Sequence, residues 1–415
     1  MAKKEKTIVT SKERFSDVYS ESHLDENDFL AFLSEMEEGS KRFTTDLKDI
    51  SVKSIVGPIL APIILQDNEF EDGTILEAVA ETVDDGTTGG IAGARMLATC
   101  MIDNAPKSFL LSNIGLATLI SRAGLDCPVI GKIGIEDKMQ MLNIALKYAA
   151  QKQVSVLFRE SKVRAFNGAN TYVPLSPHKM ISAIVKMLHD SYNGYAFKGG
   201  IYTHQKVSCS FELTGDTATI LETYKNACEA IGSVKNKNLK VCFDFMTSEI
   251  GDDCAVISVS LVRGPMRIVL GSPIQVVHNG DVSEDTFTNQ LPQLLAKTKD
   301  LVSGLEKLIN IEVKHPINCA INLAKYAGLA KTQTMAAVAD FQNYMDNVLK
   351  ADKNAKFSAH DVFYVLQETL MAMRKANVAM STIEKCEENI ARVLVSGFAW
   401  DDHDVAVRPD WGTSK

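Results

Sequence analysis

The sequence predicts an α+β protein, in which a central antiparallel sheet domain (residues 106–283) is flanked by an acidic helical N-terminal region (1–105) and a C-terminal helical bundle (284–400). A polar tail (401–415) follows. Three observations lead to this prediction: strand-like and helix-like segments alternate in the middle of the chain, tight turns join several of the strands, and helical periodicity is nearly unbroken after residue 284. With 415 residues, 46% of them hydrophobic and 23% charged, the chain can bury a sizeable core in two or three domains.

The N-terminal region is expected to be helical because its apolar residues keep a helix-like spacing within acidic stretches. Residues 15–40 carry eight carboxylates and no Lys or Arg, and a second acidic block spans residues 67–85. We interpret these blocks as solvated helical faces, with a surface for a charged partner as the alternative. The glycine-rich segment 85–95 lacks the lysine of a phosphate-binding loop, so we interpret it as a joint between helices, with anion binding as the alternative.

Eight segments of the middle region are predicted to be strands, because they are apolar or alternate with period two and are bounded by turn residues. Two-residue links, Glu160-Ser161 and His204-Gln205, join two pairs of them. Such short links require antiparallel pairing, because a parallel crossover takes a dozen or more residues. The predicted strands are Ser108–Leu111, Val154–Arg159, Lys162–Phe166, Tyr195–Thr203, Lys206–Leu213, Leu239–Met246, Cys254–Val262 and Met266–Leu270.

Helices are predicted between these strands and throughout the C-terminal region. Ser176 followed by Pro177 is typical of a helix start, since serine caps the first turn and proline fits its first position. The helices expected among the strands are Ile114–Ala123, Glu136–Ala150, Pro177–Asp190 and residues 217–231. The C-terminal region divides into four or five helices near His315-Pro316, Gly328, Lys353-Asn354 and Ser381, which is the spacing of a helical bundle.

No motif of catalysis or metal binding is present, so we predict no catalytic residue, no metal site and no cofactor. The chain has no G-x-S-x-G or H-E-x-x-H motif, and its eight cysteines are scattered without a C-x-x-C pair. One alternative stays open: a metal-dependent hydrolase site would form if four residues at the ends of predicted strands met in space, namely His204, Asp252, Asp253 and His278.

The chain is expected to be cytoplasmic and to have no membrane partner. No apolar run approaches the ~18–20 residues of a membrane-spanning helix, and the start of the chain, Met1–Lys6, lacks the apolar core of a signal peptide. The net charge of −8 also provides no overall attraction to nucleic acid or to anionic lipid, so binding to either would require a local basic surface.

Basic residues are concentrated in the strand region. Residues 151–270 contain 14 basic and 10 acidic side chains, a local charge of +4 in a chain that is otherwise strongly negative. Two interpretations remain open: the cations and interleaved aromatic residues bind phosphates and stacked bases, or the aromatic residues lie in the core and the lysines only aid solubility. The predicted phosphate contacts are Arg159, Lys162, Arg164, Lys235, Lys237, Lys240, Arg263 and Arg267. The interleaved aromatic residues are Phe158, Phe166, Tyr172, Tyr195, Phe197, Tyr202, Phe211, Phe243 and Phe245.

The order of several segments resembles a phage/plasmid-like protein family of unknown function. The segments are Phe109–Ser112, Leu116–Leu125, Met139–Tyr148, Val156–Arg159, Lys162–Phe166, Tyr172 with Pro177–Leu188, Arg267–Leu270 and Val276–Gly280. The chain departs from the family where Val277-His278 replaces the usual cysteine before an asparagine-glycine turn. The resemblance covers residues 105–310, brings no catalytic residues, and implies a role in the DNA metabolism or the assembly of a mobile element.

A second resemblance concerns topology. The predicted order of a helix (217–231), three strands and a long helix from residue 285 is similar to the core of single-strand annealing recombinases. The sequence therefore predicts a non-enzymatic, nucleic-acid-binding protein of a phage or mobile element, which binds or anneals single-stranded DNA or assists replication and recombination. It is also expected to form a homo-oligomer. The alternatives are a self-assembling structural or packaging protein and the metal-dependent hydrolase.

Overall fold

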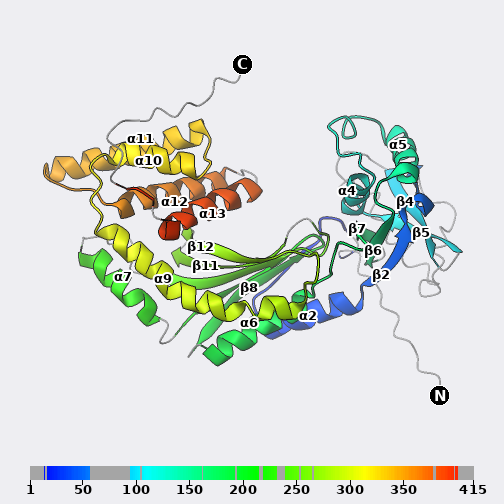
Figure 1. The fold of residues 1–415 in the computed structure, drawn as a ribbon, viewed down its shortest axis with the longest axis horizontal. Coiled ribbons are helices and arrows are strands. Elements are labelled where there is room, and N and C mark those ends of the chain that lie inside the picture. Colours follow the sequence, from blue (N-terminus) through cyan, green and yellow to red (C-terminus); the bar gives the residue numbers. More distant parts are fainter. Residues whose placement is uncertain are drawn as a thin grey trace.

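The predicted α+β class is confirmed by a computed structural model, in which antiparallel sheets combine with many helices (Figure 1). The part of the chain that the structure describes consists of residues 14–56, 94–230 and 239–400, apart from residues 15, 103–104, 161, 192–193, 215–217, 252–253, 264–265, 377–379 and 397. The second acidic block, the tail and all but the last two residues of the glycine-rich segment lie outside these residues; those two, Ala94 and Arg95, begin a strand.

Sheet A has six antiparallel strands in the order β1-β8-β9-β10-β11-β12. Five of the six were predicted from the sequence, and β12 is longer than expected because a bulge lets it continue past Leu270. The strands are β1 (Ser20–His23), β8 (Tyr195–Thr203), β9 (Val207–Leu213), β10 (Lys240–Thr247), β11 (Ala255–Arg263) and β12 (Met266–Val276).

Sheet B has six strands in the order β2-β6-β7-β5-β4-β3. All neighbouring pairs are antiparallel except β5 and β7, which run parallel because helices lie between them in the chain. The strands are β2 (Lys41–Asp46), β3 (Ser51–Val56), β4 (Ala94–Ile102), β5 (Ala105–Leu111), β6 (Gln153–Arg159) and β7 (Lys162–Gly168).

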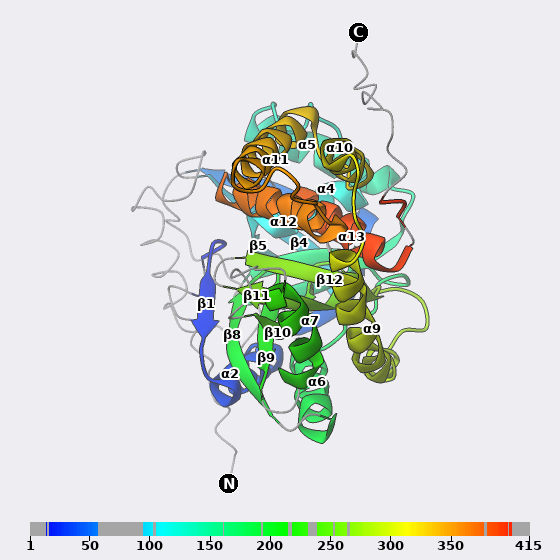
Figure 2. The same cartoon turned by 90° about the vertical axis from the view of Figure 1, so that its left-hand side faces the viewer.

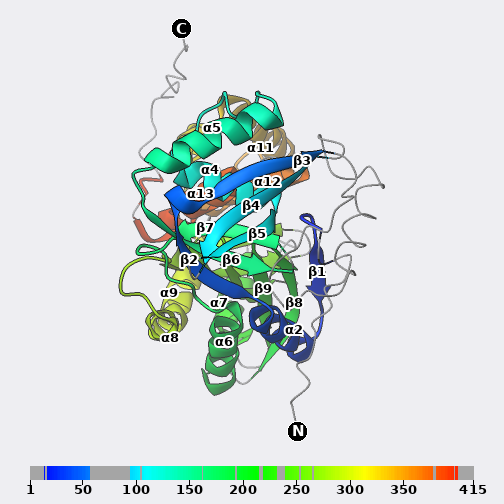
Figure 3. The same ribbon diagram turned by 90° about the vertical axis from the view of Figure 1, so that its right-hand side faces the viewer.

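Helices cover one face of each sheet. In sheet B, α4 (Asn113–Arg122) packs on β7, and α5 (Ile135–Tyr148) packs on β3 and on the 3-10 turn η1 (Leu47–Asp49) (Figure 3). In sheet A, the apolar face carries a layer of helices (Figures 1 and 2). These are α2 (Glu26–Glu38), α6 (Pro177–Ser191), α7 (Ala218–Ala230), α8 (Glu284–Thr288) and α9 (Leu291–Ile309).

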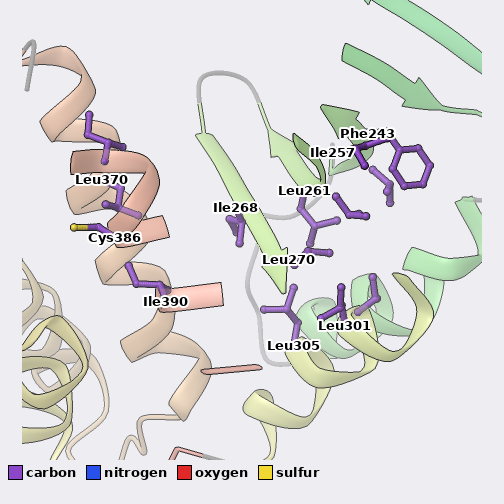
Figure 4. Close-up of a cluster of buried hydrophobic side chains, with 14 of the residues drawn as sticks. Phe243, Ile257, Leu261, Ile268, Leu270, Leu301, Leu305, Leu370, Cys386 and Ile390 are labelled. Carbon is purple, nitrogen blue, oxygen red and sulfur yellow. The ribbon is translucent and has the colours of Figure 1, made fainter. Parts of the chain in front are cut away.

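The last four helices form a bundle that continues the core of sheet A, whereas α8 and α9, which were predicted to belong to the bundle, pack on the sheet. The four helices of the bundle are α10 (Pro316–Tyr326), α11 (Lys331–Ala351), α12 (Ala359–Lys375) and α13 (Met380–Ser396). The breaks between α10, α11, α12 and α13 fall where the sequence predicted them. In Figure 4, Ile268 of β12 faces the helices that carry Leu370, Cys386 and Ile390, while Leu270 lies toward Leu305 of α9, and all of these residues belong to one core.

The N-terminal region differs from the helical region that was predicted. Its described residues contain one α-helix, α2, but also β1, β2, β3 and β4. The acidic stretch does form α2, because Asp25 caps its start by accepting from the backbone N–H groups of Asn27 and Asp28. The strands β1 and β2 were missed because they are sheet edges that carry few apolar residues, so the period-two pattern is weak in them. The strands β3 and β4 were missed although they contain more apolar residues. The N-terminal region thus completes both sheets, and the predicted central domain is divided between the two.

Candidate nucleic-acid interface

The eight cations predicted to contact nucleic acid lie in two separate parts of the molecule. Three are on β6 and β7 of sheet B, three are at one end of sheet A, and the other two lie outside the described residues, in the segment that precedes β10. In that order they are Arg159, Lys162 and Arg164; Lys240, Arg263 and Arg267; and Lys235 and Lys237.

Arg159 is buried between the two sheets and is 2% exposed. Its guanidinium forms an ion pair with Glu249 (Nη2–Oε2 2.7 Å) and donates from Nη1 to the hydroxyl of Tyr202 (2.9 Å). Burial alone would lower the pKa of Arg159, but the charge of Glu249 outweighs it and the pKa is raised. This cation is therefore fixed inside the protein and is neutralised there.

Arg164 and Lys162 share the carboxylate of Asp17. Nη1 of Arg164 and Nζ of Lys162 each lie 3.0 Å from Asp17 Oδ1, and Oδ2 accepts from the backbone N–H of Asn113 at the start of α4 (2.8 Å). Arg164 is completely buried, which lowers its pKa to about 10, so it is still charged at neutral pH. Asp17 thus joins the N-terminal segment, α4 and β7 at one point.

His204 completes this buried network as a neutral histidine. Its Nε2 lies 2.8 Å from the carbonyl oxygen of Arg14 and its Nδ1 lies 3.3 Å from the hydroxyl of Tyr202. These neighbours place the proton on Nε2, which donates to the carbonyl, and leave Nδ1 as an acceptor. Burial and the charge of Arg164 lower the pKa of His204 to about 2, so the ring does not add a further charge at neutral pH.

The two histidines of the alternative metal site, His204 and His278, are occupied by other hydrogen-bond partners. Both ring nitrogens of His204 face protein groups, and those of His278 lie 3.0 Å from the carbonyl oxygen of Val173 and 3.3 Å from Thr247 Oγ1. The two aspartates of this hypothesis, Asp252 and Asp253, lie outside the described residues. Within the described part of the chain, no three His, Cys, Asp or Glu side chains are grouped to hold one metal ion.

The structure therefore corrects the prediction for Arg159 and Arg164. Neither guanidinium is at the surface, and Lys162, with 15% of its side chain exposed, is paired with Asp17. The sequence could not reveal these pairings, because Asp17 is 147 residues from Arg164 in the chain. Tertiary structure turns this part of the basic region into an internal ion network that holds the two sheets together.

The aromatic residues of the strands are also internal. Six of the nine that were considered for base stacking are buried: Phe158, Phe166, Tyr202, Phe211, Phe243 and Phe245. In β9 and β10 they alternate with polar residues, and the period of two turns every aromatic ring of these strands toward the helix-covered face. For these six residues the second interpretation is the right one, and base stacking on their rings is excluded by burial.

The opposite face of sheet A, here called the polar face, is lined by small hydroxyl side chains around one carboxylate. Asp244 of β10 accepts from Ser210 of β9 (2.7 Å) and from Ser260 of β11. The register places these three residues on one face, together with Ser208 and Ser258. This face remains open at the edge, where Ile201 of β8 is 48% exposed.

Exposed cations collect where the polar face reaches the end of the sheet. Lys198 and Lys240 both pair with Glu212, at 3.2 Å and 2.8 Å, and about half of each lysine side chain is exposed. Lys240 is in register with Val262, and Val262 with Arg267 of β12, so residue 267 holds a position on the same face. We call Lys198, Lys240 and Arg267 the basic end of sheet A. Arg263 lies on β11 in register with Met266, beside this row.

The single carboxylate between the two lysines is itself held in the charged form. Burial of Glu212 would raise its pKa, but hydrogen bonds and charges from Lys240 and Lys198 outweigh burial, and the pKa is lowered. The hydrogen bond from Lys240 to Glu212 correspondingly raises the pKa of that lysine. Two ammonium groups on one carboxylate leave a net positive charge, so this end of the sheet can attract an anion. Sequence reasoning missed this pair because Lys198 and Glu212 lie on different strands and meet only through the pairing of β8 with β9.

Comparisons of the chain with protein-family models, with curated proteins and with solved structures find no match. Among the described residues no helix is long and apolar enough to cross a membrane.

Proposed function

We propose that the protein binds the phosphate backbone of nucleic acid at the basic end of sheet A and catalyses no reaction on it. The observation that carries the proposal is the sharing of Glu212 by two half-exposed lysines, Lys198 and Lys240, next to the position of Arg267. Phosphate contacts from lysine and arginine supply most of the affinity of non-specific nucleic-acid binding. Asp244, farther along the same face, would repel a phosphate and limits the contact to the end of the sheet.

Single-stranded DNA is the proposed ligand, and strand binding or annealing in a phage or mobile element is the proposed role. Two features support this role. The described elements α7, β10, β11 and β12, followed by the short α8 and the long α9, keep the helix–three strands–helix order on which the resemblance to annealing recombinases depends. The resemblance of residues 105–310 to a phage/plasmid-like family supports the setting in a mobile element. Because the aromatic residues of β9 and β10 are buried, the proposed contact is with phosphates and not with stacked bases.

The proposal is tested by measuring the affinity of the purified protein for a fluorescent single-stranded oligonucleotide as salt is raised. Each phosphate contact with a single strand contributes roughly 0.7 to the slope of log K against log salt. Replacing both lysines, Lys198→Gln with Lys240→Gln, should therefore lower the slope by roughly 1.4 and weaken binding at low salt. Glu212→Gln should strengthen binding at low salt, because it removes the negative charge that the two lysines share.

Lys186→Gln is the matched control, because Lys186 is an exposed lysine on α6, the helix layer on the other side of sheet A. It should leave both affinity and slope unchanged. Tighter binding by the Glu212→Gln variant is the most informative result, since a variant that merely unfolds the protein cannot produce it. Binding that does not depend on salt, or that responds equally to the change at Lys186, would show that the basic end of sheet A is not the contact surface.

A further inference from the structure

Helix α5 is apolar on two opposite faces, although it lies at the outside of the molecule. Eight of its fourteen residues are apolar. Met139, Leu142 and Leu146 are buried against sheet B, as expected for a helix that covers a sheet. A surface helix normally presents a polar face on its other side, and a helix that is apolar all round is normally buried. The second apolar face of α5 therefore requires an explanation.

The outer face of α5 carries a continuous apolar stripe. Met141, Ile144 and Tyr148 are 39%, 60% and 84% exposed, and their spacing of three and four residues places them in one row along the helix. In Figure 3, α5 lies beside β3 and β4, and Figure 1 shows that it lies on the opposite side of the molecule from the helices of the C-terminal bundle. Single exposed apolar residues are common on protein surfaces, but an aligned row of large ones is typical of an interaction surface.

The charges beside the stripe indicate what kind of surface could pack against it. The first turn of α5 is acidic, with Glu136 and Asp137, and its last turn is basic, with Lys147. At 100° per residue, Asp137 continues the apolar row, while Glu136 and Lys147 lie together on one flank of it. A helix with an acidic start and a basic end is complementary to a second copy of itself that runs in the opposite direction.

We propose that two copies of the chain pair through the outer faces of their α5 helices, antiparallel and related by a twofold axis. A twofold interface uses the same surface on both copies, so a contact from Met141 to Ile144 of the second copy is repeated from Ile144 to Met141. In this register the hydroxyl of Tyr148 comes opposite Asp137, and Lys147 comes beside Glu136. Each apolar residue of the stripe then contacts the second copy, and the acidic start of each helix lies beside the basic end of the other.

The pairing is independent of nucleic-acid binding, because α5 belongs to sheet B and the basic end lies on sheet A. It does bear on the alternative of a self-assembling protein, since one twofold contact makes a dimer, and larger particles would require a second surface. Doubling the number of basic ends in one assembly would also strengthen binding to a long strand, because the second contact becomes intramolecular.

Sedimentation or light scattering of the full chain over a range of concentrations tests the pairing. The wild-type protein should be dimeric at high concentration, and Ile144→Glu should make it monomeric. Ile144 is mostly exposed, so the variant should keep its fold, which circular dichroism verifies. Met335→Glu is the control: Met335 is 51% exposed but lies on α11, and the change should leave the dimer intact.

Reversing the charges at the two ends of α5 tests the antiparallel arrangement specifically. Glu136→Lys should raise the dissociation constant of the dimer about tenfold or more, because it sets like charges against each other. Adding Lys147→Glu to the same chain should restore pairing, since each copy then presents a basic start and an acidic end. A wild-type protein that stays monomeric up to roughly 100 μM, a dimer that survives Ile144→Glu, or a double variant that fails to recover would each overturn the proposal.

Discussion

Replacing Asp17 by Asn is expected to destabilise the protein strongly, because two cations pair with this one carboxylate. Arg164 is completely buried, and Lys162 has only 15% of its side chain exposed; both lie 3.0 Å from the same oxygen of Asp17. The asparagine side chain keeps the shape and one acceptor, but it removes the negative charge. Breaking a buried ion pair from one side typically costs about 3–5 kcal/mol. Lys162 can turn toward solvent, so we assign this cost to Arg164.

A loss of this size is a large part of the stability of a domain, which is typically about 5–15 kcal/mol. It should appear as a lower urea midpoint in circular dichroism, and as faster hydrogen exchange in β7, the strand that carries Arg164. Because a chain of this size can unfold in more than one step, the exchange measurement reports the local effect independently of the global transition.

A second substitution distinguishes a lost charge pair from a general packing defect. Arg164→Met in the Asp17→Asn protein removes the cation that Asp17 neutralised and fills similar volume, so most of the lost stability should return. Glu35→Gln is the control, because Glu35 pairs with Arg14 on the surface at 57% exposure, where an ion pair contributes less than about 1 kcal/mol. If Asp17→Asn costs no more than this control, or if Arg164→Met adds to the damage, the ion network does not hold the sheets together as described.

Three further predictions concern pH, packing and thiol chemistry. Burial lowers the pKa of His204 to about 2 and of His360 to about 4, below the ordinary 6.5, so below about pH 6.5 the unfolded chain takes up protons that the folded protein does not. Stability is therefore fully present above that pH and should fall by about 2 kcal/mol per histidine between pH 7 and pH 5, and His360→Gln should reduce the slope of urea midpoint against pH. Gly115→Ala should cost about 1–3 kcal/mol in urea unfolding, because the new Cβ would lie 2.5 Å from a backbone carbonyl oxygen of β7, whereas Gly39→Ala, with its nearest atom at 3.4 Å, should be close to neutral. A thiol reagent should modify Cys127 first in the native protein, because it is the exposed one of the eight cysteines, and mass spectrometry of the labelled peptides would reveal any buried cysteine that reacts earlier.

Secondary structure in the middle and C-terminal regions was predictable because its signals are local. The bounds of β8 are those predicted, and α6 begins at Pro177 after Ser176, as a cap and a first-turn proline require. Side-chain periodicity is sufficient there because both elements pack one face on the same core. The edge strands β1 and β2 were not predictable in this way, because they are short and polar and exist only through pairing with β8 and β6.

The candidate interface shows the opposite case. A run of basic residues around Arg159 and Arg164 has the same local sequence whether it faces water or is buried, and its partners Glu249 and Asp17 are distant in the chain. Likewise, Lys198 becomes part of a basic surface only when strand pairing brings it to Glu212.

The sequence by itself determined the α+β class, the order of the strands from β5 onward and the helical character of the C-terminal region, because backbone propensity and side-chain period act over a few residues. Tertiary structure decided which cations are available to a partner. Ion pairs join residues that are distant in the sequence, so only the folded chain shows whether a guanidinium contacts a carboxylate or solvent.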